Sequence, residues 1–123
     1  MFINFSNHRI ENWGAEQLVE AQKHGEIVDL PFPNVNPEGG ENYIASLTDE
    51  YVEKIVSYMQ DPAKDVVHVM GELNLIYSVV TKLKAQGIKC VASTTERQVM
   101  EKVSENGEIN KESTFRFIKF REY

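Results

Sequence analysis

The chain has little cysteine and no grouping of residues typical of a metal site. Only Cys90 among the 123 residues is a cysteine, so no disulfide can form within the chain. Cys90 lies in an apolar run, where a small buried hydrophobe is a simpler interpretation than a reactive thiol. No Cys/His grouping has zinc spacing. We therefore expect neither a metal nor a cofactor.

Long apolar runs and an excess of basic residues are also missing. No run approaches the roughly 20 residues that cross a bilayer, and the opening MFINFSNHRIEN lacks the layout of a signal peptide. We expect a cytoplasmic protein without membrane contact. The formal net charge of -6 argues against long nucleic acid as a partner, since such binding relies on phosphate neutralisation. Without a GxGxxG or Walker A motif, dinucleotide and P-loop sites lack support.

Short apolar runs alternate with helical patterns along most of the chain. The apolar runs predict strands at residues 2–5, 26–30, 65–70 and 88–92. Helical spacing predicts helices at residues 15–23, from an N-cap at Thr48 to Asp61-Pro62, and from Leu73 to a stop at Gly87. The alternation predicts a three-layer, Rossmann-like α/β fold with a mostly parallel sheet in the flavodoxin-like order 2-1-3-4.

The C-terminal part differs from the rest. Residues 98–104 and 113–121 read as two extended segments around the Asn-Gly turn at residues 105–108. We expect an antiparallel hairpin at the sheet edge, within one domain covering residues 1–123. Its aromatic residues exceed what an edge strand needs, which suggests that it covers a partner subunit.

Polar clusters follow three of the predicted strands. They are Ser6-Asn7-His8, Gly71-Glu72 and Ser93-Thr94-Thr95-Glu96-Arg97. Ligands of open parallel sheets bind beyond the carboxyl ends of the strands. The clusters therefore predict one crevice.

Each candidate residue has a functional and a structural interpretation. His8 can act as general acid or base, or it can be a solvated loop histidine. Glu72 can accept from a ribose hydroxyl or assist proton transfer, or complement the helix dipole.

The remaining candidates are open in the same way. Gly71 can admit a ligand to backbone amides, or serve a tight turn. The hydroxyls and guanidinium of residues 93–97 suit a phosphodiester, or form a turn with a surface ion pair. For His68, a core histidine satisfied by hydrogen bonds is the simpler interpretation.

Several segments resemble a known family. FINFSNH, EQLVEAQ, GEIVDLPFPNV and MGELNLIYSVVTKLKAQGIKCVASTTER are similar to the small Rossmann-like accessory proteins of type III CRISPR systems, including relatives of the CARF sensor domains and the small ring nucleases. The likeness spans most of residues 1–100 and lacks the basic cluster expected for several phosphates.

The resemblance implies a cytoplasmic homodimer that binds a cyclic oligoadenylate messenger in antiviral signalling. Some members cleave it without metal through attack of the ribose 2′-hydroxyl, which would make His8, Glu72 and Arg97 catalytic. Ser6, Asn7, Gly71, Ser93, Thr94, Thr95 and Glu96 would then bind the ligand. A non-catalytic sensor or sponge, or a different nucleotide or nucleoside hydrolase, are the alternatives.

Overall fold

The computed structural model describes residues 1–123 and contains one five-stranded sheet. The strands are β1 (Phe2–Ser6), β2 (Ile27–Pro31), β3 (Val66–Met70), β4 (Lys89–Val103) and β5 (Ile109–Glu122), and they lie in the order β2-β1-β3-β4-β5. β1 to β4 are parallel, whereas β4 and β5 are antiparallel. The predicted order and the C-terminal hairpin are both confirmed.

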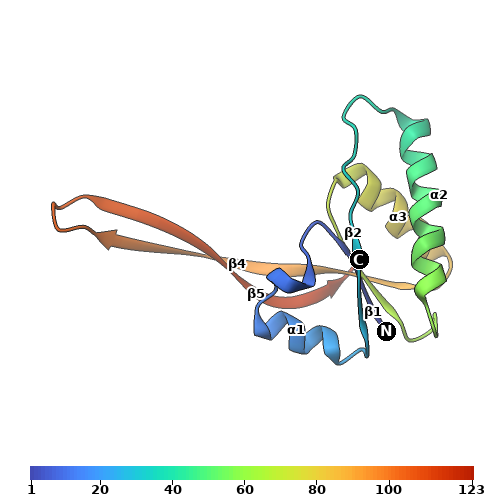
Figure 1. Ribbon diagram of the computed structural model, residues 1–123, viewed down its shortest axis with the longest axis horizontal. Helices are drawn as coiled ribbons and strands as arrows, with labels where there is room; N and C mark the ends of the chain where they lie inside the picture. The colour runs from blue at the N-terminus through green and yellow to red at the C-terminus, as the bar shows by residue number, and fades with distance from the viewer.

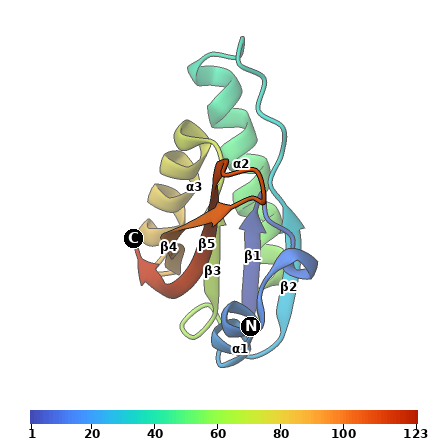
Figure 2. The ribbon, with the colours of Figure 1, turned by 90° about the vertical axis from the view of Figure 1, so that its left-hand side faces the viewer.

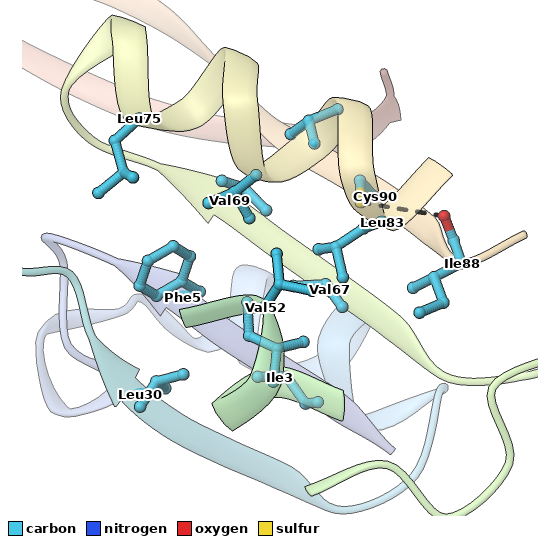
Figure 3. Close-up of a cluster of buried hydrophobic side chains, with 13 residues drawn as sticks. Ile3, Phe5, Leu30, Val52, Val67, Val69, Leu75, Leu83, Ile88 and Cys90 are labelled. Atoms are coloured by element: carbon cyan, nitrogen blue, oxygen red, sulfur yellow. Dashed lines mark hydrogen bonds between the residues drawn. The ribbon is translucent and has the colours of Figure 1, made fainter. Parts of the chain in front are cut away.

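The larger core lies on the sheet face covered by α2 (Glu41–Tyr58) and α3 (Leu73–Ala85). Figure 3 shows Phe5, Val69, Leu75 and Leu83 converging between the strands and these helices. Alternate strand residues point to this face because side chains of a strand alternate between its two sides. Thr48 Oγ1 donates to the Ile44 carbonyl within α2 (2.7 Å), and its contact with Ser78 Oγ of α3 (2.8 Å) joins the two helices.

The opposite face is covered by α1 (Ala15–Gln22) and by the short 3-10 helix η1 (Ile10–Asn12), so the fold has three layers (Figures 1 and 2). A smaller cluster fills this side, with Phe2, Ala21, Val66 and Val91 buried in it. The same face carries Asn4 and His68, which sit opposite each other in the β1–β3 register. This face is therefore partly polar.

β4 and β5 continue far beyond the other strands (Figure 1). β3 pairs with β4 only from Lys89 to Val91, so beyond Val91 the strand β4 pairs only with β5. We call residues 93–122 the arm. A register shift between Thr94 and Thr95 marks the place where it leaves the sheet. Gly107 closes the turn at φ 81°, a conformation that glycine adopts at little cost.

Two sequence predictions are wrong in detail. Residues 93–97 belong to the continuous strand β4 and do not form a loop at its end, because pairing with β5 extends the strand through them. The predicted N-cap Thr48 lies inside α2, which begins at Glu41, since its hydroxyl is satisfied within the helix layer. The buried face of α3 is formed by Leu75, Val79, Val80 and Leu83, whereas Leu73 and Tyr77 are exposed.

Candidate functional site

A cavity of about 420 Å³ lies on the α1 side of the sheet. It is lined by His8, Asn12, Trp13, Gln17, His68, Met70, Ser93, Thr95 and Phe115. We call it the histidine pocket. Ser93, Thr95 and Phe115 come from the root of the arm, Met70 from the end of β3, and Trp13 from the loop before α1. The pocket has the size of typical small-molecule sites, which measure roughly 300–1,000 Å³.

A polar network supports the floor of this pocket. Asn4 Nδ2 donates to the His8 carbonyl (2.9 Å) and to Asp29 Oδ1 (2.7 Å). Both partners are acceptors, so the assignment of the Asn4 amide is fixed and its Oδ1 is left to accept. Ser6 Oγ lies 2.8 Å from that oxygen, and His68 Nδ1 also lies 2.8 Å from it. His68 Nδ1 must therefore carry a proton.

The protonation state of His68 follows from its surroundings. Burial, together with the nearby charge of His8, lowers the pKa of His68 to about 4. The ring is neutral at pH 7, and its single proton is on Nδ1. Nε2 is then an acceptor with a free lone pair.

Two ring nitrogens in the pocket wall have no hydrogen-bond partner. They are His68 Nε2 and Trp13 Nε1, and both are shut off from solvent. The two rings meet edge to face, with centroids 5.6 Å apart. One nitrogen is an acceptor and the other a donor. An unpartnered buried polar group costs about 1–3 kcal/mol, so such groups call for an explanation, such as a ligand that completes them.

The structure brings together only part of the predicted site. His8, Ser93 and Thr95 line the histidine pocket. Ser6 is buried beneath it, where its hydroxyl serves the Asn4 network and the His8 carbonyl.

A second, shallower hollow holds the next group of candidates. Asn7, Gly71 and Glu72 lie there beside Phe32. The Glu72 carboxylate accepts from the backbone N–H groups of Asn74 (3.1 Å) and Leu75 (2.8 Å), so it caps α3. A Cβ on Gly71 would meet the Phe32 ring at 2.6 Å. Packing against Phe32 therefore explains this glycine.

The last candidates belong to the arm and do not line the pocket. Thr94 Oγ1 donates to the Lys119 carbonyl (3.1 Å). Glu96 stands opposite Arg116 in the β4–β5 register, and Arg97 donates to Ser113 Oγ (2.9 Å from Nη2). Glu96 and Arg97 are exposed, and no Lys or Arg lines the histidine pocket.

Sequence reasoning missed the pocket's most informative residues, Trp13 and His68. Trp13 is the single tryptophan of the chain and falls in a predicted loop, which is an unusual place for a large apolar ring. Period-two alternation in FINFS and VVHVM places Asn4, Ser6 and His68 on one sheet face. These signals were present in the sequence.

No group of His, Cys, Asp and Glu in the structure could hold a metal ion. No helix has the length and apolar character to cross a membrane. Cys90 is buried, and burial raises the pKa of its thiol to about 12.

Comparison with known proteins identifies a family. No curated protein and no solved structure matches the chain significantly. One family model matches residues 1–121, nearly the whole chain, and it is described as the "Uncharacterized protein MJ1673 family". The chain therefore belongs to the MJ1673 family.

Proposed function

We propose that the chain binds an adenine nucleotide in the histidine pocket, with cyclic oligoadenylate as the first candidate. The proposal rests on the two ring nitrogens without hydrogen-bond partners, the acceptor Nε2 of His68 and the donor Nε1 of Trp13. Adenine presents the complementary pair, an N6 amino donor beside a ring-nitrogen acceptor. Both nitrogens are buried in the structure, so binding requires the rings of Trp13 and His68 to shift toward the pocket.

The remaining walls suit a base better than a phosphate. Trp13 and Phe115 offer aromatic faces, and stacking of a base on such a face contributes about 1–3 kcal/mol. No cationic side chain lines the pocket. Its volume of about 420 Å³ accommodates one nucleotide unit and not a whole cyclic oligonucleotide. A ring would then be shared between two copies of the chain, as in a homodimer.

These features favour a binding module over an enzyme. Of the three residues predicted to be catalytic, only His8 lines the pocket. Glu72 caps a helix and Arg97 contacts the arm. The protein would then act as a sensor or sponge for the messenger in type III CRISPR signalling.

Cleavage is the second candidate because the exposed imidazole of His8 lies at the pocket. The ribose 2′-oxygen would attack the adjacent phosphorus, the P–O5′ bond would break, and the 5′-oxygen would leave. His8 could take the 2′-hydroxyl proton or supply one to the leaving oxygen. Incubation with cyclic tri-, tetra- and hexa-adenylate in EDTA tests this step. Products that disappear in His8→Ala would support it, and intact ligand at micromolar protein would refute it.

Binding is tested by calorimetry with the same rings, with AMP and with the matching guanine nucleotides. Guanine offers an acceptor oxygen where adenine has its amino donor, so we expect adenine ligands to bind at least about tenfold more tightly, equivalent to about 1.4 kcal/mol. Trp13→Phe keeps an aromatic ring at this position but removes the Nε1–H donor, and it should weaken adenine binding about tenfold. Asn34→Ala, in the separate shallow hollow, is the matched control and should bind normally.

Three results would count against this proposal. They are no binding of any adenine ligand, equal binding of guanine ligands, and an unchanged affinity in Trp13→Phe. Release of free adenine from nucleosides would instead indicate a nucleoside hydrolase on the same fold.

A further inference from the structure

The arm exposes apolar side chains to solvent, where they do not stabilise a monomer through burial. Six of the large hydrophobic residues that are exposed on the chain belong to it: Val99, Met100, Val103, Ile109, Phe115 and Ile118, with 47% to 72% of their surface accessible. The register places Val103 opposite Ile109 and Arg97 opposite Phe115, so Val99, Val103, Ile109 and Phe115 share one face of the arm. These four side chains form an apolar stripe on that face, which Arg97 and the Glu101–Lys111 pair interrupt.

The arm is also poorly supported by the rest of the molecule. Beyond Val91 it has only two strands, and each has one edge without a backbone partner. A two-stranded hairpin alone is marginally stable in water, and free edges invite pairing with another chain. Ion pairs between Lys102 and Glu112 (3.2 Å) and between Lys111 and Glu101 (3.9 Å) are exposed and contribute little.

Charge is distributed unevenly along the arm. Its tip half, residues 101–112, carries four acidic and two basic side chains. Its root half, residues 93–100 and 113–122, carries four basic and two acidic side chains. The arm therefore has an acidic tip and a basic root. Two arms side by side in the same direction would repel, whereas two arms in opposite directions place each tip against the other root.

We propose that two copies of the chain pair through their arms in antiparallel orientation, related by a two-fold axis. The apolar stripes pack on each other, and each acidic tip meets the basic root of the other copy. A two-fold contact of this kind is self-complementary, and it closes the assembly at two copies. The proposal does not depend on which ligand the histidine pocket takes.

The size of the arm indicates that the contact must extend past the stripe. The nine residues 95–103 span roughly 30 Å at about 3.3 Å per residue, and two strands about 5 Å apart present a face on the order of 300 Å². Two such faces total about 600 Å², below the roughly 1,000 Å² of a stable interface. The tip must therefore continue onto the body of the second copy.

That continuation ends at the histidine pocket. Thr95 and Phe115 stand at the root of the arm and line the pocket. The tip of the second copy, residues 104–108, then covers the pocket mouth and completes its wall. This coverage would make the pocket less open in the dimer than in a single chain.

The first test measures the mass in solution by light scattering and sedimentation. We expect twice the chain mass for the wild type at micromolar concentration, with weaker association in high salt because exposed charges are screened. A shortened variant lacks residues 98–103 and 109–114, which are paired with each other in register, and keeps the turn at 104–108. It should be a monomer with an unchanged thermal transition of the body. A monomeric wild type, or a dimeric shortened variant, would overturn the proposal.

The second test exchanges the charges. Glu105→Lys with Glu108→Lys reverses the tip, and Arg97→Glu with Lys119→Glu reverses the root. Each double variant alone should lose at least about tenfold in dimer affinity, because like charges then face each other. An equimolar mixture should restore a dimer containing one copy of each, since both tip–root contacts are again of opposite sign. Dimerisation that survives either reversal, or a mixture that stays monomeric while both variants are folded, would contradict antiparallel pairing.

Discussion

At the residue scale, Asn4 joins more of the site than any other side chain. It is fully buried and links Asp29, Ser6, the His8 backbone and His68. Its amide sets which nitrogen of His68 holds the proton, and so makes the other one an acceptor. A structural residue thereby determines the hydrogen-bonding character of the pocket.

Replacing this amide should be costly. We expect Asn4→Leu to lower the free energy of unfolding by about 2–4 kcal/mol, because Asp29, Ser6 and His68 Nδ1 lose their common partner inside the protein. Urea denaturation measures the change. Asn7→Ala, at an exposed position directly after β1, is the control and should stay within about 0.5 kcal/mol of wild type. A small effect at Asn4 would mean that water replaces the amide.

The lowered pKa of His68 makes stability depend on pH. Between its unfolded value of 6.5 and its folded value of about 4, the unfolded chain binds a proton that the folded chain does not. The contribution of His68 to the free energy of unfolding is therefore fully present above pH 6.5. It is lost as the pH drops toward 4, by on the order of 3 kcal/mol. Asp65, whose pKa is also lowered, mainly through backbone hydrogen bonds that outweigh its burial, loses its contribution only below 3.8, the pKa of an unperturbed aspartate.

Urea denaturation from pH 7.5 to pH 4 tests this prediction. His68→Leu should flatten the profile. The control is His24→Gln, because burial and Lys89 also lower the pKa of His24, but that ring is exposed. His24→Gln should keep most of the slope. A steep profile in His68→Leu would assign the effect to another group.

At the element scale, the start of α3 shows how a candidate catalytic group serves the fold. Glu72 stands at the N-cap and accepts two backbone N–H groups. A carboxylate there satisfies orphan donors and complements the helix dipole. The same contacts occupy two of the N–H groups that an anionic ligand would use at this helix end.

We expect Glu72→Ala to lower the free energy of unfolding by about 1 kcal/mol, as loss of an N-cap does, while ligand affinity in the histidine pocket stays the same. Thermal denaturation and calorimetry measure the two quantities. Glu41→Ala in the first turn of α2, where no side-chain cap bond forms, should cost less. A loss of ligand binding in Glu72→Ala with unchanged stability would instead show that Glu72 takes part in ligand binding.

The elements also show what the sequence could predict and what it could not. Strand order and hairpin follow from apolar runs and an Asn-Gly turn, which are local signals. The role of residues 93–97 was missed, because a run such as STTER has no apolar pattern of its own. Its extension into β4 depends on the partner residues 115–120, which lie about twenty positions later.

The site was predictable to a similar degree. His8, Ser93 and Thr95 were placed together by the rule for parallel strands, and they do line one pocket. Trp13 and His68 were not predicted as site residues. Their importance comes from ring nitrogens without hydrogen-bond partners, and no sequence pattern indicates such a feature.

At the scale of the whole molecule, the body and the arm differ in how they are stabilised. The body has buried clusters on both sheet faces. Most arm residues are exposed. Local opening should therefore differ between them.

Hydrogen exchange should reveal this difference. At dilutions where the chain is a monomer, we expect amides of residues 98–114 to exchange at least about a hundredfold faster than those of β1 and β3, because few buried contacts hold the arm closed. At concentrations that favour the dimer, the arm should become protected while the body is unchanged. Mass spectrometry of exchanged peptides measures both. Equal protection of arm and body in the dilute sample would show that the hairpin is stable alone.

The single thiol of the chain is enclosed under α3 and is held protonated by its surroundings. An alkylating reagent should therefore modify Cys90 only after the body opens, so the modification rate reports the rate of that opening. Because Cys90 does not react in the folded protein, an engineered surface cysteine can be labelled selectively. A cysteine engineered at the arm tip would be the only one to accept a fluorophore or a crosslinker, so distances between two copies could be measured in the native protein without first removing Cys90.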